Sequence, residues 1–138
     1  MQSEFFELEN KLADQLSFIK DKSGLFAVKA EFEAEGASFR DLVRLRVLTA
    51  RKNVRLYLKI GGVEALRDIK DAMELGVDGL IAPMVESPFG VMKFVGAVES
   101  IFSQRKLFKS INIETRTAVE NIDAILEVAR NKIDNVTI

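Results

Sequence analysis

The chain has 138 residues, with 20 basic and 21 acidic side chains and a formal net charge of −1. This length is typical of one domain, and a composition of 48% apolar and 30% charged residues excludes intrinsic disorder. The sequence contains no cysteine and no histidine. Disulfides, thiolate metal sites, imidazole bases, histidine-dependent triads and the common zinc sites are therefore excluded.

The balanced charge and the polar N-terminus also bear on partners and location. The charge gives no electrostatic reason to expect binding to nucleic acid or to an anionic membrane surface. The first residues are acidic and polar, unlike a signal peptide. The longest apolar stretch, residues 79–85, is far shorter than the about 20 residues that a membrane-spanning helix needs. We therefore expect a cytoplasmic protein that binds neither nucleic acid nor membrane.

The hydrophobic period alternates between that of a helix and that of a strand along the whole chain. A first helical segment is followed by strands predicted at residues 25–33, 54–60, 80–85, 107–114 and 135–138, with one helix between each pair. In chain order, the helices are predicted by apolar stripes at Phe5, Leu8, Leu12, Leu16 and Ile19; Phe39, Leu42, Val43 and Val47; Leu66, Ile69 and Met73; Val91, Val95, Val98 and Phe102; and Ile122, Ile125, Leu126 and Ala129.

Residues typical of helix ends mark the boundaries of these segments. A hydroxyl side chain accepts a hydrogen bond at the start of a helix, and glycine tolerates the left-handed conformation that often ends one. The start signals are Ser38, Ser87 with Pro88 after it, and a capping box of Thr117 with Glu120; the end signals are Gly24 and Gly76.

One helix, four strand–helix pairs and a last strand predict an α/β fold with parallel strands and right-handed crossovers. Two architectures fit this order: a partial (β/α)8 TIM barrel of about five strands, or a flavodoxin-like doubly wound sheet. The order of strands in the sheet distinguishes them, because 1-2-3-4-5 indicates the barrel and 2-1-3-4-5 the doubly wound sheet. A complete barrel needs about 250 residues, so this chain cannot hold all of one.

The last predicted strand favours the barrel. Residues 135–138 have no helix after them to cover the strand, whereas a flavodoxin-like domain usually finishes with one. We therefore expect residues 1–138 to form a single domain that is a truncated, N-terminal portion of a TIM barrel. Unpaired strand edges in such a portion invite pairing with another chain, which predicts a homo-oligomer.

Polar side chains stand at the carboxyl ends of the predicted strands, where parallel α/β folds place their functional groups. Lys29, Glu31 and Glu33 alternate at i, i+2 spacing, so they should share one face of the first strand. Such a row is commonly a solvated face. In a barrel it would point into the lumen, where unpaired charges are costly and Lys29 could pair with either glutamate.

Two further strand ends carry candidate groups. Gly61 and Gly62 follow the second strand, where they would either let an anion approach the next helix or form a tight turn. Neither nucleotide-binding glycine fingerprint is present. Glu114 ends the fourth strand, where its carboxylate could bind a hard cation or serve as a first-turn acid favoured by the helix dipole. The residues alone leave both pairs of alternatives open.

Three segments carry a family pattern. Residues 62–88 have the sequence GVEALRDIKDAMELGVDGLIAPMVESP, residues 111–126 have INIETRTAVENIDAIL, and residues 30–42 have AEFEAEGASFRDL. Together they resemble the HpcH/HpaI hydroxyketoacid aldolase and citrate lyase β-subunit family. The first segment resembles its third-strand region, the second its metal-ligand strand with Glu-Thr-Arg, and the third its Asp-x-Glu-His segment.

The resemblance implies a pyruvate–phosphoenolpyruvate type (β/α)8 barrel. Such an enzyme makes or breaks a carbon–carbon bond next to a 2-oxo acid, or acts on CoA thioesters such as citryl- or malyl-CoA. It also implies Mg²⁺ or Mn²⁺, held by two carboxylates, which chelates the keto acid and stabilises the enolate. The residue match makes Glu114 the first metal carboxylate. The second, an Asp in a Gly-x-x-Asp-Leu segment, would begin just beyond residue 138.

The other candidate site residues are Lys59 and Glu33 as catalytic groups, and Lys29, Glu31, Lys59 and Gly61 as substrate-binding groups. Lys59 stands nearest to an arginine that holds the substrate carboxylate in the aldolases, and lysine binds a carboxylate as a point charge. Ala34 stands near the position of the aldolases' histidine base, which makes the citrate lyase-like branch the better analogy.

From these residues and this resemblance we expect a fragment of a divalent-metal-dependent carbon–carbon lyase, inactive on its own. It would act on a 2-oxo acid or an acyl-CoA thioester through an enolate. The alternative is a non-enzymatic α/β domain that binds a partner or a small anion.

Overall fold

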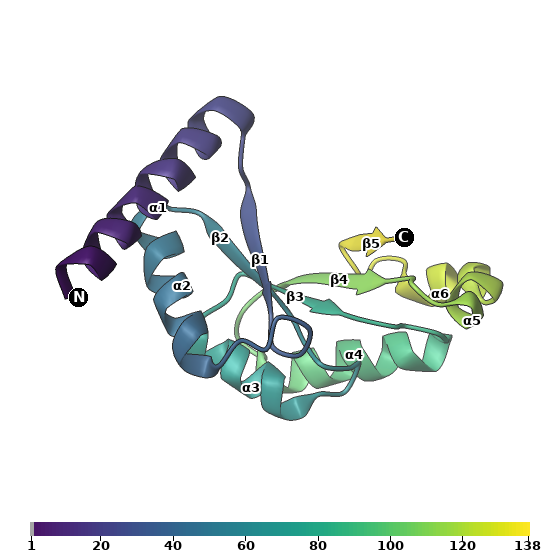
Figure 1. Cartoon of the computed structure of the whole chain (residues 1–138). Helices are drawn as coiled ribbons and strands as arrows, with labels where there is room; N and C mark the ends of the chain where they lie inside the picture. The colour runs from purple at the N-terminus through teal and green to yellow at the C-terminus, as the bar shows by residue number, and fades with distance from the viewer. Residues whose placement is uncertain (1) are drawn as a thin grey trace.

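The computed structural model describes residues 2–138, with side chains from residue 4 onward. Its strands are β1 (Ala27–Glu31), β2 (Arg55–Lys59), β3 (Gly79–Ala82), β4 (Phe108–Asn112) and β5 (Asn135–Thr137). Neighbouring strands are all parallel, and their order in the sheet is β1-β2-β3-β4-β5 (Figure 1). This sequential order confirms the α/β fold with the topology of a partial barrel and excludes the flavodoxin-like sheet.

The helices follow one another around one side of the twisted sheet (Figure 1). They are α1 (Gln2–Ser23), α2 (Phe39–Arg51), α3 (Leu66–Leu75), α4 (Pro88–Ile101), α5 (Arg116–Glu120) and α6 (Ile122–Ala129). One core lies between the sheet and these helices, and its fully buried side chains include Leu56, Leu58, Leu80, Ile111, Phe94, Ile69 and Ile125. In the described part of the chain, no helix is both long enough and apolar enough to span a membrane.

The other face of the sheet carries an aromatic layer. Because side chains alternate along a strand, Tyr57 points away from its buried neighbours Leu56 and Leu58. Its ring stacks on that of Phe108 across β3, with centroids 4.7 Å apart. The strand between them begins with Gly79, where a Cβ atom would lie only 2.7 Å from Tyr57 Cδ1. Glycine at this position therefore permits the stack.

Most of the predicted helix ends are confirmed. Ser38 and Asp41 form a reciprocal capping box at the start of α2, and Ser87 accepts a hydrogen bond from the Gly90 amide at the start of α4. Gly76 ends α3 in the left-handed conformation, with φ of 63°.

The last predicted cap is wrong. Thr115, not Thr117, caps the helix by accepting from the Ala118 amide. Glu120 pairs instead with Arg116, at 2.9 Å. Asn121 then separates α5 from α6, so the single predicted helix is two.

The strands are shorter than the apolar runs that predicted them. The run 25–33 keeps only Ala27–Glu31 as a strand, so Glu33 lies beyond β1 and does not continue the row of Lys29 and Glu31. The run 80–85 becomes Gly79–Ala82 because Pro83 has no amide hydrogen for the ladder and Met84 takes a left-handed conformation, with φ of 48°. The other three strands lose one or two residues at their predicted ends.

The apolar stripes are buried only in part. Leu42, Ile69 and Ile125 are fully buried, but α1 packs mainly on α2 and not on the sheet. As a result, the α1 stripe residues Phe5, Leu8, Leu12 and Ile19 are 43 to 54% exposed. The other predicted stripe residues that the structure leaves exposed are Phe39, Val43, Val47, Leu66, Met73 and Leu126.

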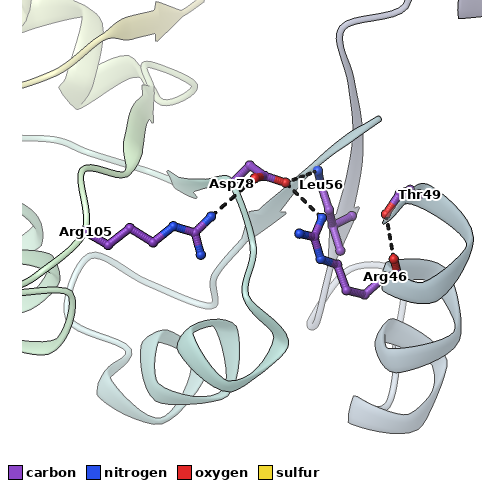
Figure 2. A network of polar contacts seen from close by, with 5 residues as sticks. All are labelled: Arg46, Thr49, Leu56, Asp78 and Arg105. Atoms are coloured by element: carbon purple, nitrogen blue, oxygen red, sulfur yellow. Dashed lines mark hydrogen bonds and ion pairs between the residues drawn. The ribbon is translucent and has the colours of Figure 1, made fainter. Parts of the chain in front are cut away.

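The carboxylate of Asp78, just before β3, joins three segments at the amino ends of the strands (Figure 2). Asp78 Oδ2 accepts hydrogen bonds from the Leu56 amide at 3.0 Å and from Arg46 Nη1 of α2 at 2.9 Å. Asp78 Oδ1 accepts from Arg105 Nη2, in the connection between α4 and β4, at 3.3 Å. The Asp78 amide in turn donates to the Leu56 carbonyl at 2.8 Å. One side chain thus fixes β3 to β2 and both to the helix layer.

The same backbone motif recurs two strands later. Asp134, just before β5, accepts a hydrogen bond from the Lys109 amide of β4 through Oδ2 at 2.8 Å. The Asp134 amide donates to the Lys109 carbonyl, also at 2.8 Å. An aspartate that precedes a strand therefore completes the pairing of β3 with β2 and of β5 with β4.

We predict that Asp78→Ala lowers the free energy of unfolding by about 2–3 kcal/mol, because it removes a charge-assisted acceptor and leaves the Leu56 amide without its partner. Urea unfolding followed by circular dichroism measures the loss. The matched control is Glu74→Ala, an exposed acid on α3, which should change stability by no more than about 0.5 kcal/mol. Equal stability of the two variants would contradict the role given to Asp78.

Candidate functional site

A cavity of about 590 Å³ opens at the carboxyl ends of the first four strands. It brings together four of the sequence-predicted site residues, Glu33, Lys59, Gly61 and Glu114, from the ends of β1, β2 and β4. Its lining consists of Glu33, Ala34, Lys59, Ile60, Gly61, Pro83, Met84, Glu114 and Thr115. The predicted residues Lys29 and Glu31 do not line it; they lie on β1 beside Lys59.

Glu31 and Lys59 form an ion pair across two neighbouring strands. The two residues are directly opposite in the register of β1 and β2, and Lys59 Nζ lies 2.5 Å from Glu31 Oε2. Their side chains are only 10% and 18% exposed, respectively. Lys29, which is half exposed, lies farther from the carboxylate, with Nζ 3.8 Å from Glu31 Oε1. Lys29 therefore pairs with Glu31 and not with Glu33, and Lys59 is the principal partner.

The pair fixes the charge of both groups at neutral pH. The hydrogen bond from Lys59 lowers the pKa of Glu31, and the positive charge of Lys29 acts in the same direction. The hydrogen bond to Glu31 raises the pKa of Lys59, and the charges of Glu114 and Glu35 add to this effect. Lys59 is therefore an ammonium ion at neutral pH, in the lining of a cavity that also contains Glu33 and Glu114, and such a cation can hold an anion.

Glu114 is held by donors from two strands. Its Oε1 atom accepts a hydrogen bond from the Met84 amide at 2.9 Å, and its Oε2 atom accepts from Asn112 Nδ2 at 3.3 Å. The left-handed backbone at Met84 turns that amide at the end of β3. Because Thr115 is the N-cap of α5, Glu114 lies before the cap and outside the first turn. Its orientation comes from these two donors.

Gly61 lies between two carboxylates. Its amide donates to Asp68 Oδ2 at 2.7 Å, and a Cβ atom at Gly61 would lie 3.1 Å from Glu33 Cγ. The amide is therefore already occupied, and both neighbouring groups would repel a phosphate. This geometry does not favour an anion site at the glycine pair, and it gives Gly61 a role in leaving room for Glu33.

Sequence reasoning gave no role to the groups that orient the site. Met84 and Asn112 hold Glu114, and Thr115 Oγ1 donates to Glu86 Oε1 at 2.7 Å. The available signal was a place at the carboxyl end of a predicted strand, within the last residues for Met84 and Asn112 and just after the strand for Glu86 and Thr115. The left-handed turn at Met84 has no such signal, because nothing in a Pro-Met dipeptide predicts it. Among the residues from 4 onward, no group of three acidic side chains forms a ready metal site.

Comparison with known proteins gives one kind of match. No protein-family model and no curated protein matches the sequence. Solved structures do match: an HpcH/HpaI aldolase from Desulfitobacterium hafniense DCB-2, with a TM-score of 0.70 and 22% identity, covers 88% of this chain. The chain has the fold of these aldolases.

Two further solved structures share the fold of this chain. An HpcH/HpaI aldolase/citrate lyase family protein from Burkholderia cenocepacia J2315 has a TM-score of 0.71 at 14% identity and covers 91% of the chain. The citrate synthase SbnG has a TM-score of 0.66 at 17% identity and covers 90%. The chain spans 55 to 58% of the length of the three structures. The resemblance inferred from the motifs is confirmed for the fold.

The cross-strand pair yields a pH prediction. Because the folded-state pKa of Glu31 is lowered, its contribution to stability is present at neutral pH and is lost as the pH falls through that pKa. In Lys59→Met the main partner is gone, so an NMR titration should show the Glu31 carboxyl titrating at higher pH than in the wild type. Lys29→Met is the matched control and should shift it less. An identical Glu31 titration in all three proteins would contradict the pairing.

Proposed function

We propose that the chain is part of a divalent-metal-dependent carbon–carbon lyase of the HpcH/HpaI aldolase and citrate lyase kind. Its substrate would be a 2-oxo acid or an acyl-CoA thioester, and the reaction would pass through an enolate. The observation that carries the proposal is the convergence of the Lys59 ammonium group and the oriented Glu114 carboxylate on one cavity at the carboxyl ends of the strands. That is where (β/α)8 enzymes hold their substrates.

Lys59 is the residue that would hold the substrate's carboxylate. It is the cation among the residues that line the cavity, and its raised pKa keeps it charged throughout the neutral range. Glu31, pressed against it from β1, fixes the position of the ammonium group and partly neutralises it. Lys29, more exposed on the same strand and outside the lining of the cavity, would act only at longer range, by adding positive charge beside Glu31.

Glu114 is the residue that would bind Mg²⁺ or Mn²⁺. These hard cations take one or two protein carboxylates and complete their coordination with water and substrate oxygens, so a single oriented carboxylate fits this donor chemistry. Both Glu114 oxygens already accept a hydrogen bond from neutral donors, which leaves the negative charge intact. When bound, the metal ion would supply stabilisation of the negative charge that develops on the enolate oxygen.

Glu33 is our candidate for the group that moves the proton. The chain has no histidine, and Glu33 lines the cavity with an exposed carboxyl group. A carboxylate there would accept a proton from the carbon next to the carbonyl, or return it when the bond is cleaved. The close approach of Glu33 to Gly61 keeps the carboxylate against the wall of the cavity.

A metal titration tests the role of Glu114. We expect Mn²⁺ to bind the wild-type chain and pyruvate or oxaloacetate to tighten that binding, as measured by the relaxation of water protons. Glu114→Gln, which keeps the shape and removes the charge, should weaken Mn²⁺ binding by about tenfold or more. Glu127→Gln, an exposed acid on α6, is the control. Equal Mn²⁺ binding by wild type and Glu114→Gln would remove Glu114 from the metal role.

A second titration separates the roles of the two charged residues. Lys59→Met should leave Mn²⁺ binding in the absence of substrate close to wild type, but should abolish the tightening by oxaloacetate, because the cation for its carboxylate is gone. Lys59→Arg should retain part of the effect. If oxaloacetate tightens Mn²⁺ binding equally in Lys59→Met, the lysine does not hold the substrate.

A further inference from the structure

An apolar groove lies between α1 and α2, away from the cavity at the strand ends. Its volume is about 340 Å³, and no residue that lines it also lines the cavity. Large apolar side chains face it from both helices: Phe5, Leu8 and Leu12 from α1, and Val43 and Val47 from α2. Each of these is at least 40% exposed, and Leu8 and Val47 reach 54%. A contiguous apolar surface of this kind marks an interaction site.

The contact between the two helices leaves about half of each of these side chains exposed, although Phe5 packs under Arg44 of α2, whose Cζ atom lies 5.2 Å from the ring centroid. Ala13, which is 2% exposed, is the buried apolar residue of α1. Lys20 fastens the end of α1 by donating to the carbonyls of Lys52 and Asn53, at 3.0 and 3.1 Å. The α1 stripe, with residues three and four apart, is therefore presented beside α2 and not buried under it. Such spacing is what a helix needs to pack against further helices.

The two walls of the groove carry opposite charge. The α1 sequence has five acidic and three basic residues, a net charge of −2, whereas α2 has four arginines and one aspartate, a net charge of +3. At the groove itself, Glu9 stands on the α1 side and Arg44 and Arg51 on the α2 side. Within the residues whose side chains are described, none of these three forms an ion pair, although Arg44 lies over the Phe5 ring of its own chain.

We propose that this groove is the dimer interface of the protein and that its occupant is the same groove of a second copy. A partner must bring an apolar stripe, a positive wall for Glu9 and a negative wall for the arginines. The chain itself presents all three on one surface. A two-fold axis would place α1 of each copy on α2 of the other, which makes the contact isologous and self-limiting. This dimer goes beyond the proposed function. Its interface is formed by helices, whereas the sequence led us to expect association through unpaired strand edges.

The first test is the effect of one buried charge on oligomeric state. Sedimentation equilibrium from about 1 μM to about 100 μM should show a dimer for the wild type. Leu12→Glu, in the middle of the stripe, should be monomeric over that range with an unchanged far-UV circular dichroism spectrum. Phe6→Glu is the matched control, since Phe6 is 64% exposed on α1 but does not line the groove. A monomeric wild type, a dimeric Leu12→Glu or a monomeric Phe6→Glu would each overturn the proposal.

A charge exchange gives the second test, at the half-buried Glu9 and the exposed Arg44 and Arg51, with far-UV circular dichroism as the check that each variant is folded. In a dimer of the Glu9→Arg variant, the new arginine of each copy would face Arg44 and Arg51 of the other copy. In a dimer of the double variant R44E/R51E, the new acids of each copy would face Glu9 of the other copy. Each should be monomeric alone. Mixed in equal amounts, they should form a heterodimer, because both contacts are then between opposite charges. A mixture that stays monomeric would overturn the two-fold arrangement.

Discussion

The carboxylate of Asp78 is the interaction on which the arrangement of the sheet most depends. It accepts hydrogen bonds from the backbone of β2, from Arg46 on α2 and from Arg105 before β4, while its own amide pairs with the Leu56 carbonyl (Figure 2). A short strand of four residues has few ladder bonds of its own, so this anchor strengthens its register against β2. Asp134 pairs β5 with β4 in the same way, through hydrogen bonds with the amide and the carbonyl of Lys109. The repeated aspartate therefore sets the sheet from its amino edge, where no candidate site residue lies.

The opposite, carboxyl edge of the sheet carries the candidate site residues. At the carboxyl ends the charged side chains are not used to join segments of backbone; they face a cavity and one another. The Lys59–Glu31 pair shows how the two edges cooperate, because the direct opposition of these residues follows from the β1–β2 register. A slip of one residue would turn Lys59 toward the hydrophobic core and Leu58 away from it. Accurate register at one end is thus a condition for the charge arrangement at the other.

The sequence predicted the parts of this structure that depend on local pattern. Alternating hydrophobic periods gave the order of strands and helices, and short-range signals such as Ser38 and Gly76 placed helix ends, because each acts within one turn. It failed where distant contacts decide. Thr117 and Thr115 are equally plausible caps locally, and only the path of the chain after Glu114 selects Thr115. The orientation of Glu114 rests on an amide thirty residues earlier, and the exposed α1 stripe follows from where that helix docks.

The aromatic layer across β3 gives this protein an internal spectroscopic reporter. Tyr57 is the only tyrosine, and the chain has no tryptophan, so near-ultraviolet absorption and emission in the tyrosine bands come from a single ring. That ring lies between Phe26 and Phe108, over a glycine of the strand between β2 and β4. Its signal therefore monitors the packing of three adjacent strands without any label. Changes in near-ultraviolet tyrosine ellipticity would report on the face of the sheet that carries the aromatic layer. Far-ultraviolet circular dichroism would report separately on the helices that cover the other face.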